Sequence, residues 1–97
     1  MLHLCVEFEW DGAKATANKQ KHGVTFAEAA TVFADPHTLI TSDVLHAHRF
    51  NILGRSSRDR TLFVVYAEKF HDQTIRIISA RRATRAERQA YEEDGAF

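Results

Sequence analysis

The segment Thr61–Arg82, TLFVVYAEKFHDQTIRIISARR, decides the fold of this chain. It contains two runs rich in Val, Ile, Thr and aromatic residues, Thr61–Ala67 and Gln73–Ala80, with a short stretch between them. Such residues favour β-strands, and a connection this short joins antiparallel neighbours, because a parallel crossover needs about a dozen residues or more. The segment therefore predicts a β-hairpin.

Two runs of similar composition precede the hairpin, His37–Thr41 and Arg49–Arg55, and short polar turns such as Ser56–Arg60 separate the runs. Four strands joined in this way predict an antiparallel meander. Leu62–Tyr66 is apolar on both faces of its strand. We therefore expect this strand to be central in the sheet and to be covered on each side.

The N-terminal part predicts a strand and then a helix. Residues 3–9 alternate between apolar and polar side chains, which is typical of a half-buried edge strand. Asp11 is a favourable N-cap for a helix over Gly12–His22, and Gly23 supplies the left-handed residue that ends it. The polar residues that share one face of this helix at helical spacing are Lys14, Asn18 and Lys21.

Two capping boxes predict the starts of further helices. In Thr25–Glu28 and in Thr84–Glu87, the Thr hydroxyl and the Glu carboxylate can satisfy free backbone amides. The first of these helices ends at Asp35-Pro36 and the second runs to about Glu93. The predicted order is β-α-α-β-β-β-β-α, a small α+β domain over residues 1–97 in which helices flank an antiparallel sheet. The apolar stripe of the first of these helices is Phe26, Ala29, Ala30 and Phe33.

The charges balance in total but not along the chain. The 97 residues carry 13 Lys+Arg and 13 Asp+Glu, which excludes a diffuse attraction of the whole surface to nucleic acid. Residues 76–90, however, hold five Arg against one Glu, and residues 51–60 hold three Arg against one Asp. Because salt screens charges beyond about 8–10 Å, such a local excess of positive charge attracts nearby anions whatever the net charge of the chain is. They predict either a local anion-binding site or a solvated arginine face.

Composition also narrows the class of protein. The single Cys5 forms no internal disulfide, no run approaches about 18 apolar residues, and the N-terminus lacks the pattern of a signal peptide. We therefore expect a cytoplasmic protein without a membrane span. The six His are scattered apart from His46 and His48, and no glycine-rich nucleotide motif is present. Neither a metal site nor a cofactor is expected.

The last predicted strand carries the most informative charges. Arg76 interrupts a core-like strand and needs either a carboxylate partner or a polar cleft. Glu68, at the end of the preceding strand, is the candidate partner. Arg81 and Arg82 stand at a strand–helix junction, where a helix N-terminus adds free amides and a favourable dipole. Their guanidinium groups suit phosphate and the charge of a phosphodiester transition state.

Two further residues allow two interpretations each. His22 follows Lys21 at the end of the first helix, where it can cap the helix dipole or act as a general acid or base. Tyr91 lies four residues after Glu87 on the last helix. It either packs against the sheet with its hydroxyl at the rim or stacks on a base beside the arginines.

Several segments together resemble the BrnT toxin family, over about residues 7–93. The early K-H-G-V-x-F and the late R-I-I-S-A-R-x-A-T-x-x-E-R are specific in combination. The segments that carry the resemblance are Phe8-Glu9-Trp10-Asp11 with Lys14, Asn18–Phe26, Ala29-Ala30, Val32-Phe33, Asp35-Pro36, Arg76–Thr84, Glu87-Arg88 and Tyr91.

The resemblance implies a fold similar to the RelE toxins and a ribonuclease that blocks translation as the toxin of a bacterial type II toxin–antitoxin pair. It also implies a BrnA-like ribbon-helix-helix antitoxin that binds DNA, and a toxin–antitoxin heterotetramer. The family's polar positions match at Lys21, His22, Glu68, Arg76, Arg81 and Tyr91.

On these residues we hypothesise metal-independent cleavage in which the RNA 2′-hydroxyl attacks its own phosphate. Arg76 and Arg81 would stabilise the phosphorane, and Glu68 or His22 would move protons. The residues that would contact the RNA are Lys21, Arg82 and Tyr91. The alternative is a non-catalytic module whose arginine surface binds nucleic acid or an acidic protein.

Overall fold

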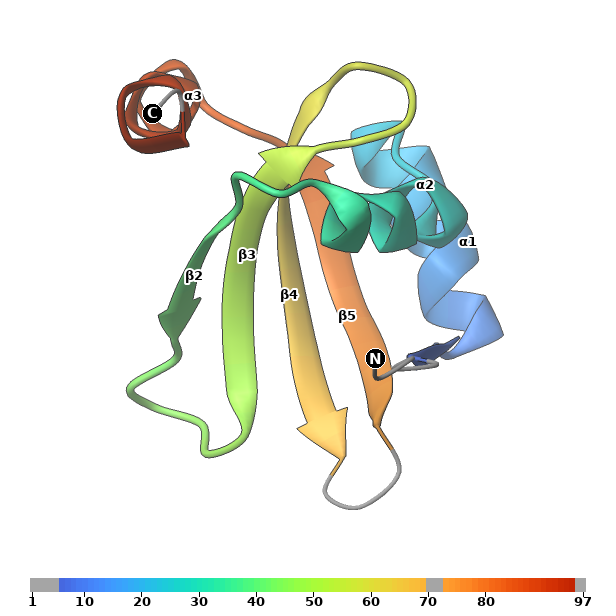
Figure 1. Cartoon of the computed structure of the whole chain (residues 1–97). Coiled ribbons are helices and arrows are strands. Elements are labelled where there is room, and N and C mark those ends of the chain that lie inside the picture. Colours follow the sequence, from blue (N-terminus) through green and yellow to red (C-terminus); the bar gives the residue numbers. More distant parts are fainter. Residues whose placement is uncertain (1–5, 70–72, 96–97) are drawn as a thin grey trace.

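The computed structural model describes residues 6–69 and 73–95. These residues form one five-stranded sheet in the order β1-β5-β4-β3-β2, with helices packed against it (Figure 1). The predicted α+β class is confirmed. In chain order the elements are β1 (Glu7–Glu9), α1 (Gly12–His22), α2 (Phe26–Thr31), the 3-10 turn η1 (Val32–Ala34), β2 (Leu39–Ser42), β3 (Arg49–Arg55), β4 (Thr61–Lys69), β5 (Thr74–Arg82) and α3 (Arg85–Gly95).

The predicted meander is confirmed for β2 to β5, which pair antiparallel, and β4 is the central strand. β1 pairs with β5 in parallel, with Glu9 opposite Arg76. Residues 3–5 of the predicted first strand lie outside the described residues. None of the described helices is long and apolar enough to cross a membrane.

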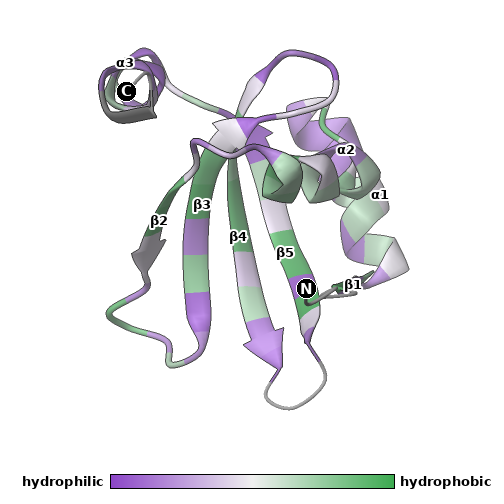
Figure 2. Ribbon diagram, in the orientation of Figure 1, coloured by the Kyte–Doolittle hydropathy of each residue, from purple (hydrophilic) through white to green (hydrophobic). Residues whose placement is uncertain are grey.

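The core lies between the sheet and α1 and α2, which cover one face (Figure 1). Leu62, Val64 and Tyr66 of β4 are buried on that side, and hydrophobic residues recur along the strands and α2 (Figure 2). Phe63 and Val65 point to the other side and are only half-buried. The expectation of cover on both sides is therefore wrong, because α3 packs near the ends of β2 and β3 instead.

The predicted helix ends are largely confirmed. Asp11 accepts a hydrogen bond from the Lys14 backbone at 2.9 Å, and Gly23 ends α1 with a φ of 70°. At α3, the Thr84 hydroxyl accepts from the Glu87 backbone at 3.1 Å, while the Glu87 carboxylate accepts from the Thr84 backbone at 2.9 Å. Spacing alone located these caps because each depends on residues within one turn.

The first capping box is only half formed. The Thr25 hydroxyl accepts from the Glu28 backbone at 3.0 Å as predicted. The Glu28 carboxylate is buried and accepts instead from Arg60 Nε at 2.9 Å and from the Ser56 hydroxyl at 2.7 Å. These hydrogen bonds, that from Arg60 first, lower the pKa of Glu28. Glu28 therefore ties α2 to the β3–β4 turn rather than closing its own helix.

Asn18 is buried, unlike Lys14 and Lys21 with which it was predicted to share a polar face. Its Nδ2 donates to the carbonyls of Val24 at 2.9 Å and Ala80 at 2.7 Å, and its Oδ1 accepts from the Ala80 backbone at 3.1 Å. Asn18 thus pairs with the outer edge of β5 as a neighbouring strand would, and fixes α1 there.

A Gly54→Ala substitution should lower the free energy of unfolding by about 1–3 kcal/mol. A Cβ at this position would lie 2.7 Å from Val32 Cγ1 and 2.8 Å from Thr38 Cγ2, so the close approach of η1 to β3 requires glycine. Urea denaturation measures the loss. Gly12→Ala is the matched control, because a Cβ there meets nothing within 4 Å. Equal stability of the two variants would contradict the tight contact.

Candidate functional site

The face of the sheet turned away from α1 and α2, here called the open face, carries the candidate site. Register pairs Phe63 with Leu53 on β3 and with Arg81 on β5, so these side chains share a face. Apolar side chains occupy its middle, while cationic and polar ones lie around them. The open face consists of Arg49, Asn51, Leu53, Phe63, Val65, Ala67, Arg76, Ser79 and Arg81.

A β-bulge brings Arg76 and Arg81 to the same face. The two residues are five positions apart, and in a regular strand an odd spacing puts side chains on opposite faces. The register shifts between Val65 and Tyr66, which pair with Ser79 and Ile77 and leave Ile78 as the extra residue. Bulges re-aim side chains in this way and are common beside active sites. Both arginines therefore project from the open face.

Arg81 is held rigidly on this face. Its Nη1 and Nη2 donate to the two carboxylate oxygens of Glu87 at 2.8 and 2.9 Å, and its guanidinium carbon lies 4.3 Å from the centre of the Phe63 ring. The bonds from Arg81 lower the pKa of Glu87, and the same pairing raises the pKa of Arg81. Since Glu87 also caps α3, the helix start and the arginine position each other.

Arg76 pairs with Glu9, and the predicted pairing with Glu68 is wrong. Arg76 Nη1 donates to Glu9 Oε2 at 2.8 Å, and Lys69 Nζ lies 3.0 Å from the same oxygen. The hydrogen bond from Arg76 is the main reason why the pKa of Glu9 is lowered. Without the bulge, continued register would place Glu68 opposite Arg76. With it, Glu68 lies opposite Ile75.

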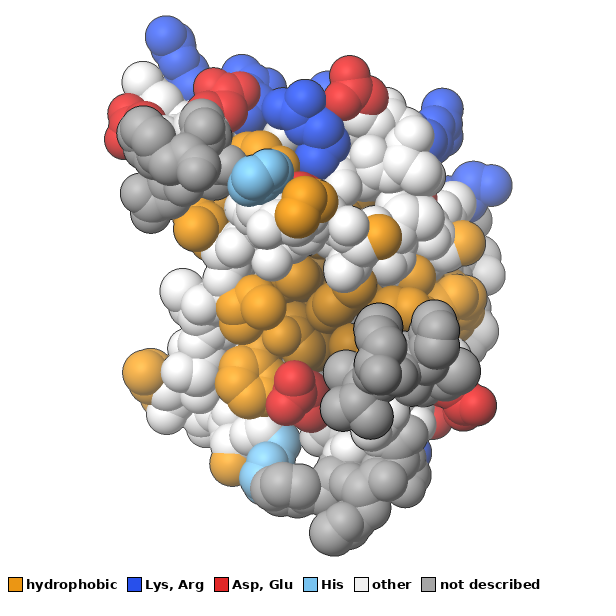
Figure 3. Space-filling view, viewed as in Figure 1, with side chains coloured by type: hydrophobic (Ala, Val, Ile, Leu, Met, Phe, Trp, Pro, Cys, Tyr) orange, Lys and Arg blue, Asp and Glu red, His pale blue; other side chains and the backbone are white. Residues whose placement is uncertain are grey.

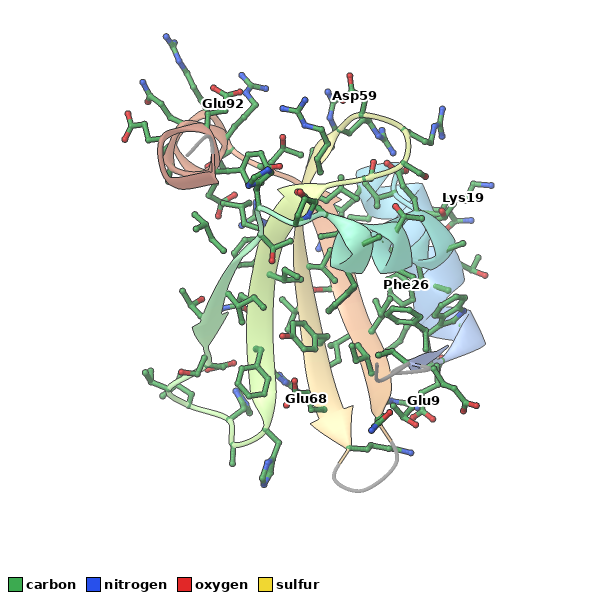
Figure 4. The ribbon with its side chains drawn as sticks, viewed as in Figure 1. Glu9, Lys19, Phe26, Asp59, Glu68 and Glu92 are labelled. Atoms are coloured by element: carbon green, nitrogen blue, oxygen red, sulfur yellow. The ribbon has the colours of Figure 1, made fainter. Side chains whose placement is uncertain are left out.

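Glu68, which Figure 4 labels, consequently lies on the helix-bearing side of the sheet, and alternation along β4 places it on the same side as Tyr66. Its charge contributes to the raised pKa of the Tyr66 hydroxyl, after the larger effect of burial. The structure therefore does not bring Glu68 together with Arg76 and Arg81.

Lys21 and His22 lie at the end of α1, beside the outer edge of β5. Asn18 is level with Ala80, and His22 comes one helical turn later, about 6 Å further along α1. Lys21 and Arg82 are exposed and His22 is half-buried. Within the described part of the chain, none of the three hydrogen-bonds through its side chain to Arg81.

Basic residues from the end of α1, from the turn between β3 and β4, and from the β5–α3 junction meet at the end of the sheet where β3 and β5 finish, here called the basic end. Figure 3 shows Lys and Arg side chains gathered along it. Several of them have no carboxylate within ion-pair distance among the described residues, so they present uncompensated positive charge. These are Lys19, Lys21, Arg58, Arg82, Arg85 and Arg88.

Tyr91 is buried, which supports the packing interpretation and leaves no free ring face for a base. It is 6% exposed, and its hydroxyl donates to Asp35 Oδ2 at 2.6 Å. The same oxygen accepts from the Arg55 backbone at 2.8 Å, and the Arg55 guanidinium carbon lies 5.9 Å from the ring centre. Tyr91 therefore anchors α3 to the end of β3.

Both tyrosines of the chain should remain protonated in the folded protein at pH 10. Burial is the first cause that raises the pKa of Tyr66 and of Tyr91 to about 12, and for Tyr91 the bond to Asp35 adds to it. In the unfolded chain the value is about 10. The corresponding stabilisation is therefore complete below pH 10 and is lost as the pH rises to about 12. Tyrosinate absorbance measures this. Half-ionisation of the native protein at pH 10 would contradict the buried environments.

The sequence did not point to Phe63 or Glu9 as residues of the site, and it indicated only a helix-capping role for Glu87. Alternation along β4 does point to Phe63, but nothing local signals the pairing of Glu9 across a parallel strand. Among the described residues, no three His, Cys, Asp or Glu side chains gather so that they could hold a metal ion.

Comparisons with known proteins agree with this architecture. The family described as "Ribonuclease toxin, BrnT, of type II toxin-antitoxin system" matches residues 10–87. The crystal structure of the Brucella abortus ribonuclease toxin BrnT superposes with a TM-score of 0.66 at 21% identity, over 82% of this chain and 99% of that one. No curated protein sequence matched. The family match spans most of the chain, and the chain belongs to the BrnT family of ribonuclease toxins of type II toxin–antitoxin systems.

Proposed function

We propose that the open face is the surface on which this toxin cleaves RNA, and that Arg81 is its principal catalytic residue. The observation that carries this proposal is the fixed guanidinium of Arg81. Glu87 holds this guanidinium in a bidentate pair, and the guanidinium lies over the face of the Phe63 ring, at a half-exposed position. A charge fixed before the substrate arrives stabilises a transition state without further reorganisation.

The reaction begins when the 2′-hydroxyl of a nucleotide attacks the adjacent phosphorus. The bond from phosphorus to the 5′-oxygen of the next nucleotide breaks, which leaves a 2′,3′-cyclic phosphate and a 5′-hydroxyl. The proton lost by the 2′-hydroxyl is matched by one gained at the leaving 5′-oxygen. The phosphorane between these steps carries extra negative charge. Arg81 keeps N–H donors beyond those that Glu87 uses, and Arg76 adds a second cation on the same face.

His22 is the candidate for proton transfer that we retain. Glu68 lies on the opposite side of the sheet from both arginines and pairs with Ile75 near the start of β5, whereas His22 comes one helical turn after Asn18, which hydrogen-bonds to Ala80, the residue before Arg81. Near neutral pH a histidine can either accept the proton of the 2′-hydroxyl or donate a proton to the leaving 5′-oxygen. Lys21 and Arg82 would guide the RNA backbone from the basic end towards the open face, because both side chains are exposed cations.

The family implies an antitoxin partner. We propose that this partner is a BrnA-like ribbon-helix-helix antitoxin, which forms a heterotetramer with the toxin in the bacterial cytoplasm. In this complex the antitoxin would make the contacts with DNA. The type II family of the chain supports a protein antitoxin, and the balanced total charge supports indirect contact with DNA.

Incubation of the purified toxin with RNA in EDTA tests this function. Products that end in 2′,3′-cyclic phosphate and 5′-hydroxyl are expected. RNA that binds but remains intact, both naked and on ribosomes, would favour a binding module instead. Cleavage that stops in EDTA and returns with a divalent cation would contradict metal independence.

A further inference from the structure

The free edge of the sheet at β2 carries large apolar side chains in contact with solvent. Ile40 is 54% exposed, and in the following loop Val44 is 95% and Leu45 83% exposed. The half-buried Phe50 pairs with Ser42 and lies on the same face of the sheet as Ile40. We call Ile40, Val44, Leu45 and Phe50 the edge patch.

Hydrogen bonds hold the loop of the edge patch in place. The Asp43 backbone donates to the Arg49 carbonyl at 2.9 Å, and the Asp43 carboxylate accepts from the Leu45 backbone at 2.9 Å and lies 3.1 Å from His46 Nδ1. Val44 and Leu45 are thus fixed outward rather than folded back onto the sheet. Large apolar side chains that are exposed in this way along one edge of a sheet mark interaction sites.

The backbone of β2 also presents free hydrogen-bonding groups. Because Asp43 donates to Arg49 across the strand pair, alternation turns the N–H groups of Ile40 and Ser42 away from β3. β2 is the last strand on this side of the described sheet. It contains no Lys or Pro of the kind that usually protects an edge. An extended segment can therefore add to it as a further strand.

We propose that the antitoxin docks on this edge, with an extended segment whose uncharged, apolar side chains cover the edge patch. The charge of the surface argues for a protein and against RNA, because β2 carries no charged residue and RNA requires cations. The loop between β2 and β3, which carries Val44 and Leu45, lies at the opposite end of the sheet from α3 and the basic end (Figure 1).

Size and position distinguish the antitoxin from a second copy of the toxin. The area of the edge patch is smaller than the about 800 Å² that each partner buries in a specific interface. The partner must therefore also contact the surface around the edge. β2 borders the open face through Thr41, which pairs with Asn51. Ile40 and Phe50 lie on the helix-bearing side, so an antitoxin strand paired with β2 would cover them with alternate side chains and border the open face with the others. A second copy would place two open faces side by side and neutralise neither.

The double variant V44S/L45S tests the proposal, with V6S as control. Val6 is 41% exposed beside β1, at the opposite edge of the sheet. Titration calorimetry with the cognate BrnA-like antitoxin should show binding at least about 30-fold weaker for V44S/L45S, since buried aliphatic side chains at an interface centre contribute about tenfold each. V6S should bind as the wild type does. RNA cleavage by V44S/L45S should be unchanged, so this test is independent of the catalytic proposal.

A second variant addresses the backbone. Ser42→Pro removes an N–H that points away from β3, and it should also weaken binding of the antitoxin while the protein remains folded. Affinities of V44S/L45S and Ser42→Pro that equal the wild-type value would overturn the proposal. So would light scattering that shows a wild-type dimer and a monomeric V44S/L45S with unchanged affinity for the antitoxin, because the occupant would then be a second copy.

Discussion

Replacement of Arg81 by alanine should lower kcat/KM for RNA cleavage by at least about 100- to 1000-fold, the loss found when a fixed transition-state donor is removed from an active site. Arg81 is held in place before RNA binds, by Glu87 at 2.8 and 2.9 Å and by the Phe63 ring. The loss should fall mainly on kcat, because the extra charge of the phosphorane exists only in the transition state. Initial rates of cleavage of a short RNA, measured at increasing RNA concentration, give both constants.

The matched variants for Arg81→Ala are Arg81→Lys and Arg88→Ala. Lysine keeps the charge but loses the planar, bidentate fork, so Arg81→Lys should remain strongly impaired. Arg88 is exposed on α3 and has no carboxylate partner among the described residues, so Arg88→Ala should cleave nearly as well as the wild type. Melting curves show whether each variant is folded. A folded Arg81→Ala protein with wild-type kcat would contradict the assignment.

Replacement of Asn18 by alanine should lower the free energy of unfolding by about 3–5 kcal/mol. The amide makes hydrogen bonds with the backbone of Ala80 in both directions and with the Val24 carbonyl. Its removal leaves these buried groups without partners, and each costs about 1–3 kcal/mol. Urea denaturation measures the loss, which is large because the whole stability of such a domain is about 5–15 kcal/mol.

Asn18→Asp and Lys14→Ala define the cause of that loss. Aspartate can still accept from the Ala80 backbone but cannot donate to either carbonyl, so Asn18→Asp should also be strongly destabilised. Lys14 lies on the same helix and is exposed, so Lys14→Ala should change the stability by no more than about 0.5 kcal/mol. If Asn18→Ala lost less than the control, α1 would not depend on this amide.

The sequence predicted the elements well because their signals are local. Asp11, Gly23 and the Thr84–Glu87 box act within one helical turn, and the meander follows from short connections between β-rich runs. Each of these features depends on residues that remain neighbours however the rest of the chain folds.

Partners distant in sequence were predicted less well, and a single bulge explains the main failure. Regular register would have placed Glu68 opposite Arg76, as expected, but the extra residue Ile78 moved Arg76 to the open face. Glu9 then became its partner, across a parallel strand pair that joins residues 67 positions apart. The spacing of charges in β5 does not reveal whether the strand is regular.

Glu28, in a helix, also has partners that are distant in sequence and that local spacing does not predict. Its position in a capping box was correct, but its carboxylate is used by Arg60 and Ser56 of a distant turn. A buried acid takes the strongest available donors, and a guanidinium outcompetes a backbone amide. Local patterns therefore located the residue but not its use.

NMR with an RNA whose 2′-hydroxyls are methylated, so that it cannot be cleaved, maps directly where RNA binds. The amide signals of Asn51 in β3, Phe63 in β4 and Arg81 in β5 should shift on titration, together with that of Arg82 at the basic end. Signals of the buried side of α2 should not move. Shifts confined to the helix-bearing side around Glu68, with none at Phe63 and Arg81, would contradict the open face as the site of cleavage.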